Sequence, residues 1–350
     1  MAILVDLYDS RSLSEAVNIV KTPEPYILSQ FFGGPAEPHD RDTIDYEVYR
    51  GSEEIASFVH ADDPNPRNVK KDVIKEVKTF KLPRTYESKF FTAQELAKIN
   101  AIGQIYSTAQ ARKAAQMDYI ATEIENLKNR VVRLKEKMAC EAISTGKIIV
   151  NQDNISFDYD FQFVNGKQLV TLAAGDLWSA STSDPSKNIR AWKKQVSKLS
   201  GVAAKKLILG STAAEKLLSN EKALKELDNN NFSNGRLLGD QDPSGSTTYL
   251  GKLAGVEVWE YHQSYVNTSG NAVDMIPTDR AVLVGESRHM RVHYGAIDVI
   301  QNKISTPILA EYYLEVDERS SNSRGIQWNL EQKSLPVIHD SGLIVSAKVV

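Results

Sequence analysis

Few side chains in this sequence have the types and spacing that catalysis needs. His289 and His293 are four residues apart, which on a helix would let both bind one metal ion. The residues around them, MRVHYGAIDVI, alternate as in a strand followed by a turn, so we expect no metal site there. Ser144 and Lys147 match a serine-nucleophile pattern, but its Ser-Asp-Asn and Lys-Thr-Gly partners are missing from the chain. We interpret Thr145-Gly146-Lys147 as the end of a helix.

Clustered carboxylates are a second candidate, because they could bind a cation or act as acid and base. None has the regular spacing of a calcium loop, so we interpret them as solvated charges that face a neighbouring subunit. Basic residues of that neighbour could pair with them and fix the register. The acidic groups are Asp40, Asp42, Asp45, Glu53-Glu54 and Asp62-Asp63, and the basic ones are Arg67, Lys70, Lys71 and Lys75.

The remaining motifs indicate structural roles and not catalysis or ligand binding. Residues 235–255 are rich in glycine but contain no phosphate-binding loop. Trp192, Trp259 and Trp328 are expected in the core or in an interface. The sequence therefore predicts no catalytic, metal or cofactor site.

Composition narrows the class of protein further. The 350 residues carry a formal net charge of -3, without the basic excess of a dedicated nucleic-acid binder. The single cysteine, Cys140, excludes an intrachain disulfide and fits synthesis in a reducing cytoplasm. There is no signal peptide pattern and no apolar window long enough to span a membrane.

The N-terminal part predicts an arm and an extended ribbon. Residues 43–50 and 73–82 read as strands on either side of a charged, turn-rich tip at 61–67. Such a ribbon buries little by itself and is marginal in water, so a neighbouring subunit should cover it.

One long helix gives the strongest periodic signal. Thr92-Ala93-Gln94-Glu95 is a capping box that starts a short helix before it. The long helix is expected to run roughly 50 Å and to end at Gly146. Its apolar positions, three or four apart, are Ile120, Ile124, Leu127, Val131, Leu134 and Met138.

The rest of the chain alternates strands and helices and then becomes rich in strands. Residues 157–163 and 168–173 are predicted to pair as a hairpin across Asn165-Gly166. Strand–helix alternation predicts an α/β unit near 184–290. Further strands are expected at 310–316, 326–332 and 344–350.

The order of these elements resembles the lambda-type major capsid proteins of tailed bacteriophages. Local residues resemble the family's extended loop, its entry into the spine helix, the end of that helix and its C-terminal signature. The corresponding segments are Ile55–Val59, Lys78–Leu96, Lys135–Lys147, and Arg324 with Gln332–Pro336. Of the family's proline-rich stretch before the spine only Pro83 is kept, and the loop tip is more acidic.

The resemblance implies the α+β fold of tailed-phage major capsid proteins. Its expected parts are an N-terminal arm (1–39), an extended β-hairpin loop (40–91), a peripheral domain with the spine helix (92–150), a β-hairpin insertion (151–183), a central axial α/β domain (184–295) and peripheral return strands (296–350).

The implied function is a shell subunit that forms hexamers and pentamers and encloses double-stranded DNA in the virion. Expected partners are further copies, a separate scaffolding protein and a portal, while a decoration protein stays open. The expected contacts between subunits are Ile55, Phe58, Asp62, Asp63, Arg67, Lys70, Lys71 and Phe80. A nanocompartment shell of the same fold and an α/β hydrolase are the alternatives.

Overall fold

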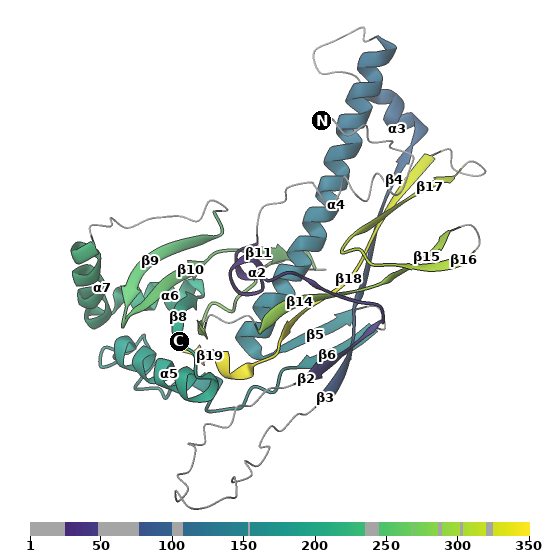
Figure 1. Ribbon diagram of the computed structural model, residues 1–350. Coiled ribbons are helices and arrows are strands. Elements are labelled where there is room, and N and C mark those ends of the chain that lie inside the picture. Colours follow the sequence, from purple (N-terminus) through teal and green to yellow (C-terminus); the bar gives the residue numbers. More distant parts are fainter. Residues whose placement is uncertain are drawn as a thin grey trace, which may run out of the picture. The chain divides into compact units, whose positions relative to one another are not determined.

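The chain folds as two compact units in the computed structural model (Figure 1). Unit 1 comprises Met1–Ile44, Lys81–Ala139 and Arg291–Pro336, and unit 2 comprises Asp45–Phe80, Cys140–Met290 and Val337–Val350. The structure describes residues 25–47, 77–99, 108–152, 155–234, 245–267, 269–285, 289–301, 304–319 and 325–350.

The long helix of the sequence prediction is α4, Ala109–Thr145. Its 37 residues span about 55 Å at the usual rise per residue. Gly146 ends it with φ +71° and donates its N–H to the carbonyl of Ala142, as predicted for a C-terminal glycine. The short helix α3, Ala93–Lys98, starts with the predicted capping box of Thr92 and Glu95.

The core of unit 1 forms where α4 packs on a sheet. Ile120, Ile124, Leu127 and Val131 of α4 are buried in one cluster with Trp328. Leu134, expected on the same apolar face, is 36% exposed. The sheet has the order β1 (Glu37–His39), β14 (Met290–Gly295), β18 (Gly325–Ile338) and β17 (Tyr313–Arg319), with β4 (Arg84–Thr92) also paired to β18. Smaller elements are α2 (Tyr26–Phe31) and the pair β15 (Ile297–Gln301) and β16 (Ile304–Ile308).

Unit 2 is built on a six-stranded mixed sheet whose apolar residues share one cluster with three helices. The strand order is β7 (Leu169–Thr171), β19 (Ile344–Lys348), β13 (Arg280–Gly285), β8 (Ala204–Leu209), β10 (Val256–Tyr261) and β9 (Thr247–Leu253). The helices are α5 (Pro185–Ser200), α6 (Ser211–Ser219) and α7 (Glu221–Asn234). Helices and a strand alternate from Pro185 to Asn234, and among the described residues strands alone follow as far as Gly285. The final strand departs from the predicted peripheral grouping, because β19 pairs with β13 and β7.

Besides the pair β15 and β16, three further two-stranded sheets complete the described part of the chain. The ends of the predicted ribbon pair as β2 (Thr43–Glu47) and β3 (Val77–Lys81), and the hydroxyl of Thr79 donates to Asp45 over 2.9 Å. The others are β5 (Lys147–Gln152) with β6 (Ile155–Asp160), and β11 (Ser264–Val266) with β12 (Ala272–Asp274).

The predicted hairpin across Asn165-Gly166 is wrong. Residues of β6 pair with β5, which precedes them, and β7 pairs in parallel with β19. Gly166 does turn the chain, with φ +77°. Gln162, also at positive φ, interrupts the aromatic alternation before that turn, so the flanking segments do not continue as one ladder.

Candidate functional site: buried charges around strand β18

Strand β18 carries two oppositely charged side chains that unit 1 buries. Glu331 and Lys333 are two residues apart in the strand and therefore project from the same face. Their side chains are only 9% and 8% exposed. Because a buried charge is tolerated only where it is paired and hydrogen-bonded, each needs a partner of opposite sign.

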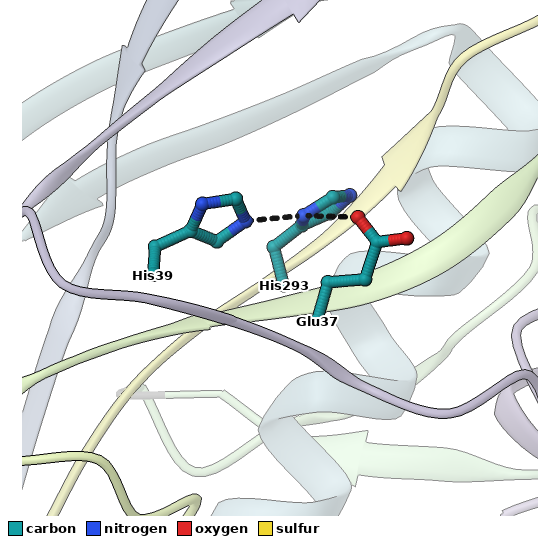
Figure 2. A group of neighbouring side chains, drawn as sticks. All are labelled: Glu37, His39 and His293. Atoms are coloured by element: carbon teal, nitrogen blue, oxygen red, sulfur yellow. Dashed lines mark hydrogen bonds and ion pairs between the residues drawn. The ribbon is translucent and has the colours of Figure 1, made fainter.

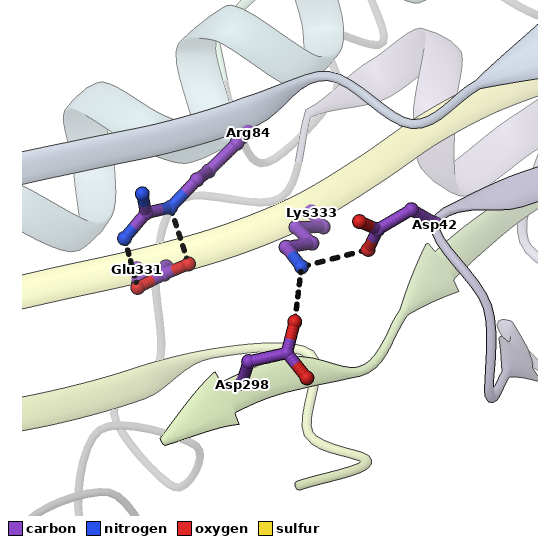
Figure 3. A network of polar contacts seen from close by, with 5 residues as sticks. All are labelled: Asp42, Arg84, Asp298, Glu331 and Lys333. Atoms are coloured by element: carbon purple, nitrogen blue, oxygen red, sulfur yellow. Dashed lines mark hydrogen bonds and ion pairs between the residues drawn. The ribbon is translucent and has the colours of Figure 1, made fainter. Parts of the chain in front are cut away.

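Arg84, at the start of β4, is the partner of Glu331 (Figure 3). Its Nε donates to Oε1 over 2.5 Å and its Nη2 donates to Oε2 over 2.8 Å. The hydrogen bond to Glu331 raises the pKa of Arg84. Two parallel bonds between planar groups fix the orientation of both side chains, so they tie β4 to β18 at this point.

Lys333 binds two carboxylates. Its Nζ donates to Oδ1 of Asp42 over 2.8 Å and lies 3.6 Å from Oδ2 of Asp298 (Figure 3). The backbone carbonyl of Asp42 in turn accepts the N–H of Leu82 over 2.8 Å. Lys333 therefore anchors the place where the chain enters β2 and returns from β3. We call Asp42, Arg84, Asp298, Glu331 and Lys333 the strand-root network.

A further buried charge lies on α4. Lys135 is 5% exposed at its side chain and donates to Glu311 over 2.5 Å and to the hydroxyl of Tyr312. Burial lowers the pKa of Lys135, against the opposing effect of Glu311. Glu136, next in the chain, accepts the backbone N–H groups of Ile27 and Leu28 over 2.8 and 3.0 Å. Neighbouring charges of α4 thus bind two different segments of unit 1.

A third polar cluster in unit 1 contains metal-ligand side chains. Nε2 of His39 lies 2.8 Å from Nδ1 of His293, and that nitrogen lies 3.6 Å from Oε2 of Glu37 (Figure 2). Arg291 binds the other oxygen of Glu37. Burial lowers the pKa of His39. His293 meets a histidine of β1, while His289, four residues earlier, lies in the turn before β14.

The residues of the nucleophile pattern are occupied in structural contacts. Ser144 is 1% exposed, and its hydroxyl donates to the carbonyl of Cys140 over 2.6 Å. Lys147 pairs with Asp160 over 3.0 Å. The geometry provides no base for Ser144 among the described residues, which agrees with the interpretation of this segment as a helix end.

The hollow beside α6 and α7 offers no support for the hydrolase alternative. Its charged lining residues are Lys216, Glu221 and Lys222, and Lys222 donates to the carbonyls of Thr182 and Ser183. Its described lining residues include no histidine or cysteine that could act with a serine.

Of the eight residues predicted at subunit contacts, the structure describes one. Phe80 is 7% exposed and packs edge-to-face against Tyr159 and Phe161 of its own chain. A ring buried within its own subunit offers little surface to another, and the contact of Phe80 with a neighbouring subunit stays a prediction. Ile55, Phe58, Asp62, Asp63, Arg67, Lys70 and Lys71 lie outside the described residues.

The other predicted groups separate into core and surface. Trp192 and Trp328 are buried in the cores of unit 2 and unit 1, as expected. Trp259 is partly exposed and contacts Tyr249, with ring centroids 4.9 Å apart. Asp42 and Asp45 bind Lys333 and Thr79 of their own chain, whereas they were expected to face a neighbour.

Sequence reasoning missed the strand-root network and the cluster around His39. Glu331 and Lys333 alternate along a strand, a signal compatible with a solvated face. Their partners Asp42, Arg84 and Asp298 are far away in sequence, and no spacing rule connects them. One signal in the sequence was available: Glu331 and Lys333 stand at alternate positions of a strand that also carries the core residues Leu330 and Leu335.

Among the helices of the described residues, none is long and apolar enough to cross a membrane.

The fold is shared with solved phage-related proteins. A capsid protein of an E. coli CFT073 prophage, described as putative, has 16% sequence identity and a TM-score of 0.69, covering 98% of this chain and 99% of that one. A phage-related protein from Bordetella bronchiseptica RB50 has 10% identity and a TM-score of 0.59, with 99% and 98% covered. The capsid of Ralstonia phage GP4 has 11% identity and a TM-score of 0.53, with 95% and 93% covered.

Sequence comparison gives the family. No curated protein sequence matches the chain significantly. The family model described as phage major capsid protein E matches residues 9–349, nearly the whole sequence, and therefore includes both units and the strand-root network. The chain belongs to the phage major capsid protein E family.

Proposed function

We propose that this capsid protein assembles into the hexamers and pentamers of an icosahedral phage head and encloses packaged double-stranded DNA. The family match over residues 9–349 carries the proposal. Many modest contacts repeated by symmetry can stabilise such a shell without catalysis, so we propose no enzymatic role.

The extended segment between β2 and β3 is proposed to reach the spine helix of a neighbouring subunit. The strand-root network supports this role, because Lys333 and Arg84 fix the chain where this segment begins and ends. If the two ends of the segment were flexible, a force that a neighbour exerts on the segment would not be transmitted to the rest of the subunit. Ile55 and Phe58 would supply apolar contact, while Asp62 and Asp63 would pair with Arg67, Lys70 or Lys71 of a neighbouring copy.

The α/β unit is proposed to bring its polar loops together at the local symmetry axis. Head maturation would then be a change between two packings of the same interfaces as DNA fills the shell. A separate scaffolding protein and a portal are the proposed further partners, and the virion is the proposed location.

Electron microscopy tests the proposal directly. The chain should be expressed alone and together with its neighbouring scaffold gene, and the particle mass should be measured by light scattering. We expect closed shells, tubes, or rings of five or six subunits. A monodisperse monomer or dimer under both conditions would contradict assembly. Packaged enzyme in place of DNA would favour the nanocompartment alternative.

Charge exchange tests the proposed contacts of the extended segment. Reversing the acidic pair in Asp62→Lys/Asp63→Lys should reduce the yield of shells. Adding Lys70→Glu/Lys71→Glu should restore part of that yield, because the attraction is then rebuilt with opposite signs. Glu221→Lys is the matched control, since the Glu221 side chain is 88% exposed on α7. Equal yields for all variants would remove these charges from the interface.

A further inference from the structure

Three metal-ligand side chains of unit 1 meet on one face of two neighbouring strands. Strands β1 and β14 pair in parallel, and the register places Glu37 opposite His293. His39 is two residues beyond Glu37, so it projects to the same side of the strand (Figure 2). Within the part of the chain that the structure describes, this is the one such group whose ligand atoms all lie within 4.8 Å of one another.

We propose that Glu37, His39 and His293 bind one divalent transition-metal ion, with Zn²⁺ as the representative of the class. Two imidazole nitrogens and one carboxylate oxygen form a donor set that suits zinc and its neighbours in the periodic table. Magnesium and calcium prefer oxygen ligands alone, so two histidines select against them.

Two of the distances between ligand atoms lie within about half an ångström of the value for a tetrahedral site. Zinc bonds of 2.0–2.1 Å place two ligand atoms about 3.3 Å apart. Nδ1 of His293 and Oε2 of Glu37 are 3.6 Å apart, near that separation. The two imidazole nitrogens are 2.8 Å apart, as in a hydrogen bond, and must separate by about half an ångström to admit the ion. His39 is partly exposed and can rotate, whereas His293 is 2% exposed.

A neighbouring arginine orients the carboxylate ligand. Arg291 binds Oε1 of Glu37 and leaves Oε2 directed toward His293, so it orients the carboxylate from outside the site. The positive charge of Arg291 repels a metal ion. The negative charge of Asp40 instead favours a cation at His39. The Glu37 side chain is 38% exposed, so an ion can enter from solvent and keep a water as fourth ligand.

A bound ion would fasten β1 to the sheet. This strand has three residues and pairs in parallel with one neighbour, β14. The ion would bridge Glu37 and His39 on β1 to His293 on β14 and add strong bonds to that short ladder. Its role in a shell protein would therefore be structural.

Zinc titration of the full-length, untagged chain tests the site. After EDTA treatment and removal of EDTA, Zn²⁺ is titrated against a chromophoric chelator, and Co²⁺ is added separately to record its visible spectrum. We expect one ion per chain, an intense tetrahedral Co²⁺ spectrum, and no displacement by excess Mg²⁺. Affinity should fall at least about tenfold in Glu37→Gln and in His39→Gln, because one ligand is lost.

The controls separate a built site from chance binding by histidine. His262→Gln removes a histidine that lies 3.7 Å from Glu260 but belongs to no described three-ligand group, and it should leave zinc affinity unchanged. His293→Gln should also lower the zinc affinity at least about tenfold, and if this buried change prevents folding, the partly exposed His39→Gln still decides. Equal zinc binding by wild type and His39→Gln, or no binding by wild type, would overturn the proposal.

Discussion

Three buried charges in unit 1 are each matched by a partner of opposite sign from a distant part of the chain. Glu331 binds Arg84, Lys333 binds Asp42, and Lys135 binds Glu311. Such pairs add little net stability, since desolvation offsets their attraction, but removing one partner leaves the other buried and uncompensated. Their effect is therefore to specify one arrangement of the strands.

Replacing Arg84 tests how far the burial of Glu331 depends on its two hydrogen bonds with the Arg84 guanidinium. Arg84→Ala should destabilise the subunit by about 1–3 kcal/mol, because Glu331 keeps its burial but loses both hydrogen bonds. The measurement is the midpoint of denaturant unfolding. Arg190→Ala is the matched control, since the Arg190–Glu226 pair is more exposed at its acidic end, and it should cost less than about 0.5 kcal/mol. Similar losses in both variants would show that Glu331 finds another partner or water.

Lys135 should make stability depend on pH in the alkaline range. Burial lowers the pKa of Lys135 in the folded chain, so between that value and the ordinary 10.5 the unfolded chain binds more protons. Stability must therefore rise with pH across this interval. Below it the amine is charged in both states, and its cost to folding is constant.

Lys135→Met should reduce this rise, of which Lys128 keeps a part because burial lowers its pKa as well, and should leave stability near neutral pH equal or slightly higher. Denaturant unfolding followed with rising pH up to about 9 checks it, because the Tyr312 hydroxyl of the unfolded chain, with an ordinary pKa near 10, is still mostly protonated there. Lys225→Met, at a 79% exposed side chain, should keep the wild-type slope. An unchanged slope in Lys135→Met would assign the pH dependence to other groups.

At the scale of elements, local rules succeeded where neighbours in sequence decide the structure. The Thr92 capping box and the Gly146 helix end were both predicted, because each depends on residues within one turn. The hairpin across Asn165-Gly166 failed because pairing depends on which strands are available. The strand with the alternating aromatic residues, β6, pairs with β5, which precedes it in the chain. Strand β7 pairs with β19.

The end of α4 depends on a glycine for two separable reasons. Gly146 has φ +71°, and a Cβ there would lie 2.3 Å from Cγ of Phe163. Gly201, after α5, has φ +68°, and a Cβ there would meet no described atom within 4 Å. Replacing Gly201 would therefore cost only the strain of the backbone conformation.

Gly201→Ala should therefore lose about 1–2 kcal/mol from the left-handed backbone conformation. Gly146→Ala should lose about 2–5 kcal/mol, because displacement of Phe163 adds to the same backbone cost. Thermal or denaturant unfolding of the two variants compares them directly. Equal losses would mean that Phe163 moves aside freely and that only the backbone conformation matters.

For the whole molecule, the order of elements was more informative than any single motif. Arm, ribbon, long helix, α/β unit and late strands together indicated the capsid fold, although each segment alone was weak. The contacts that organise unit 1 could not be predicted, because Lys333 meets Asp42 across 291 residues and His39 meets His293 across 254. A sequence pattern encodes periodicity along an element but not which elements become neighbours.

The overall charge of the chain predicts weak attraction to the DNA that the shell is proposed to enclose. Its 42 basic residues are outnumbered by 45 acidic ones, so releasing counterions from phosphates provides little driving force. A weakly interacting wall lets packed DNA slide as it enters. Fluorescence anisotropy of a labelled short duplex with unassembled subunits should give a Kd no tighter than about 10⁻⁴ M at physiological salt. Submicromolar binding with a steep salt dependence would instead reveal a concentrated basic face, and the inner wall would then hold DNA in place.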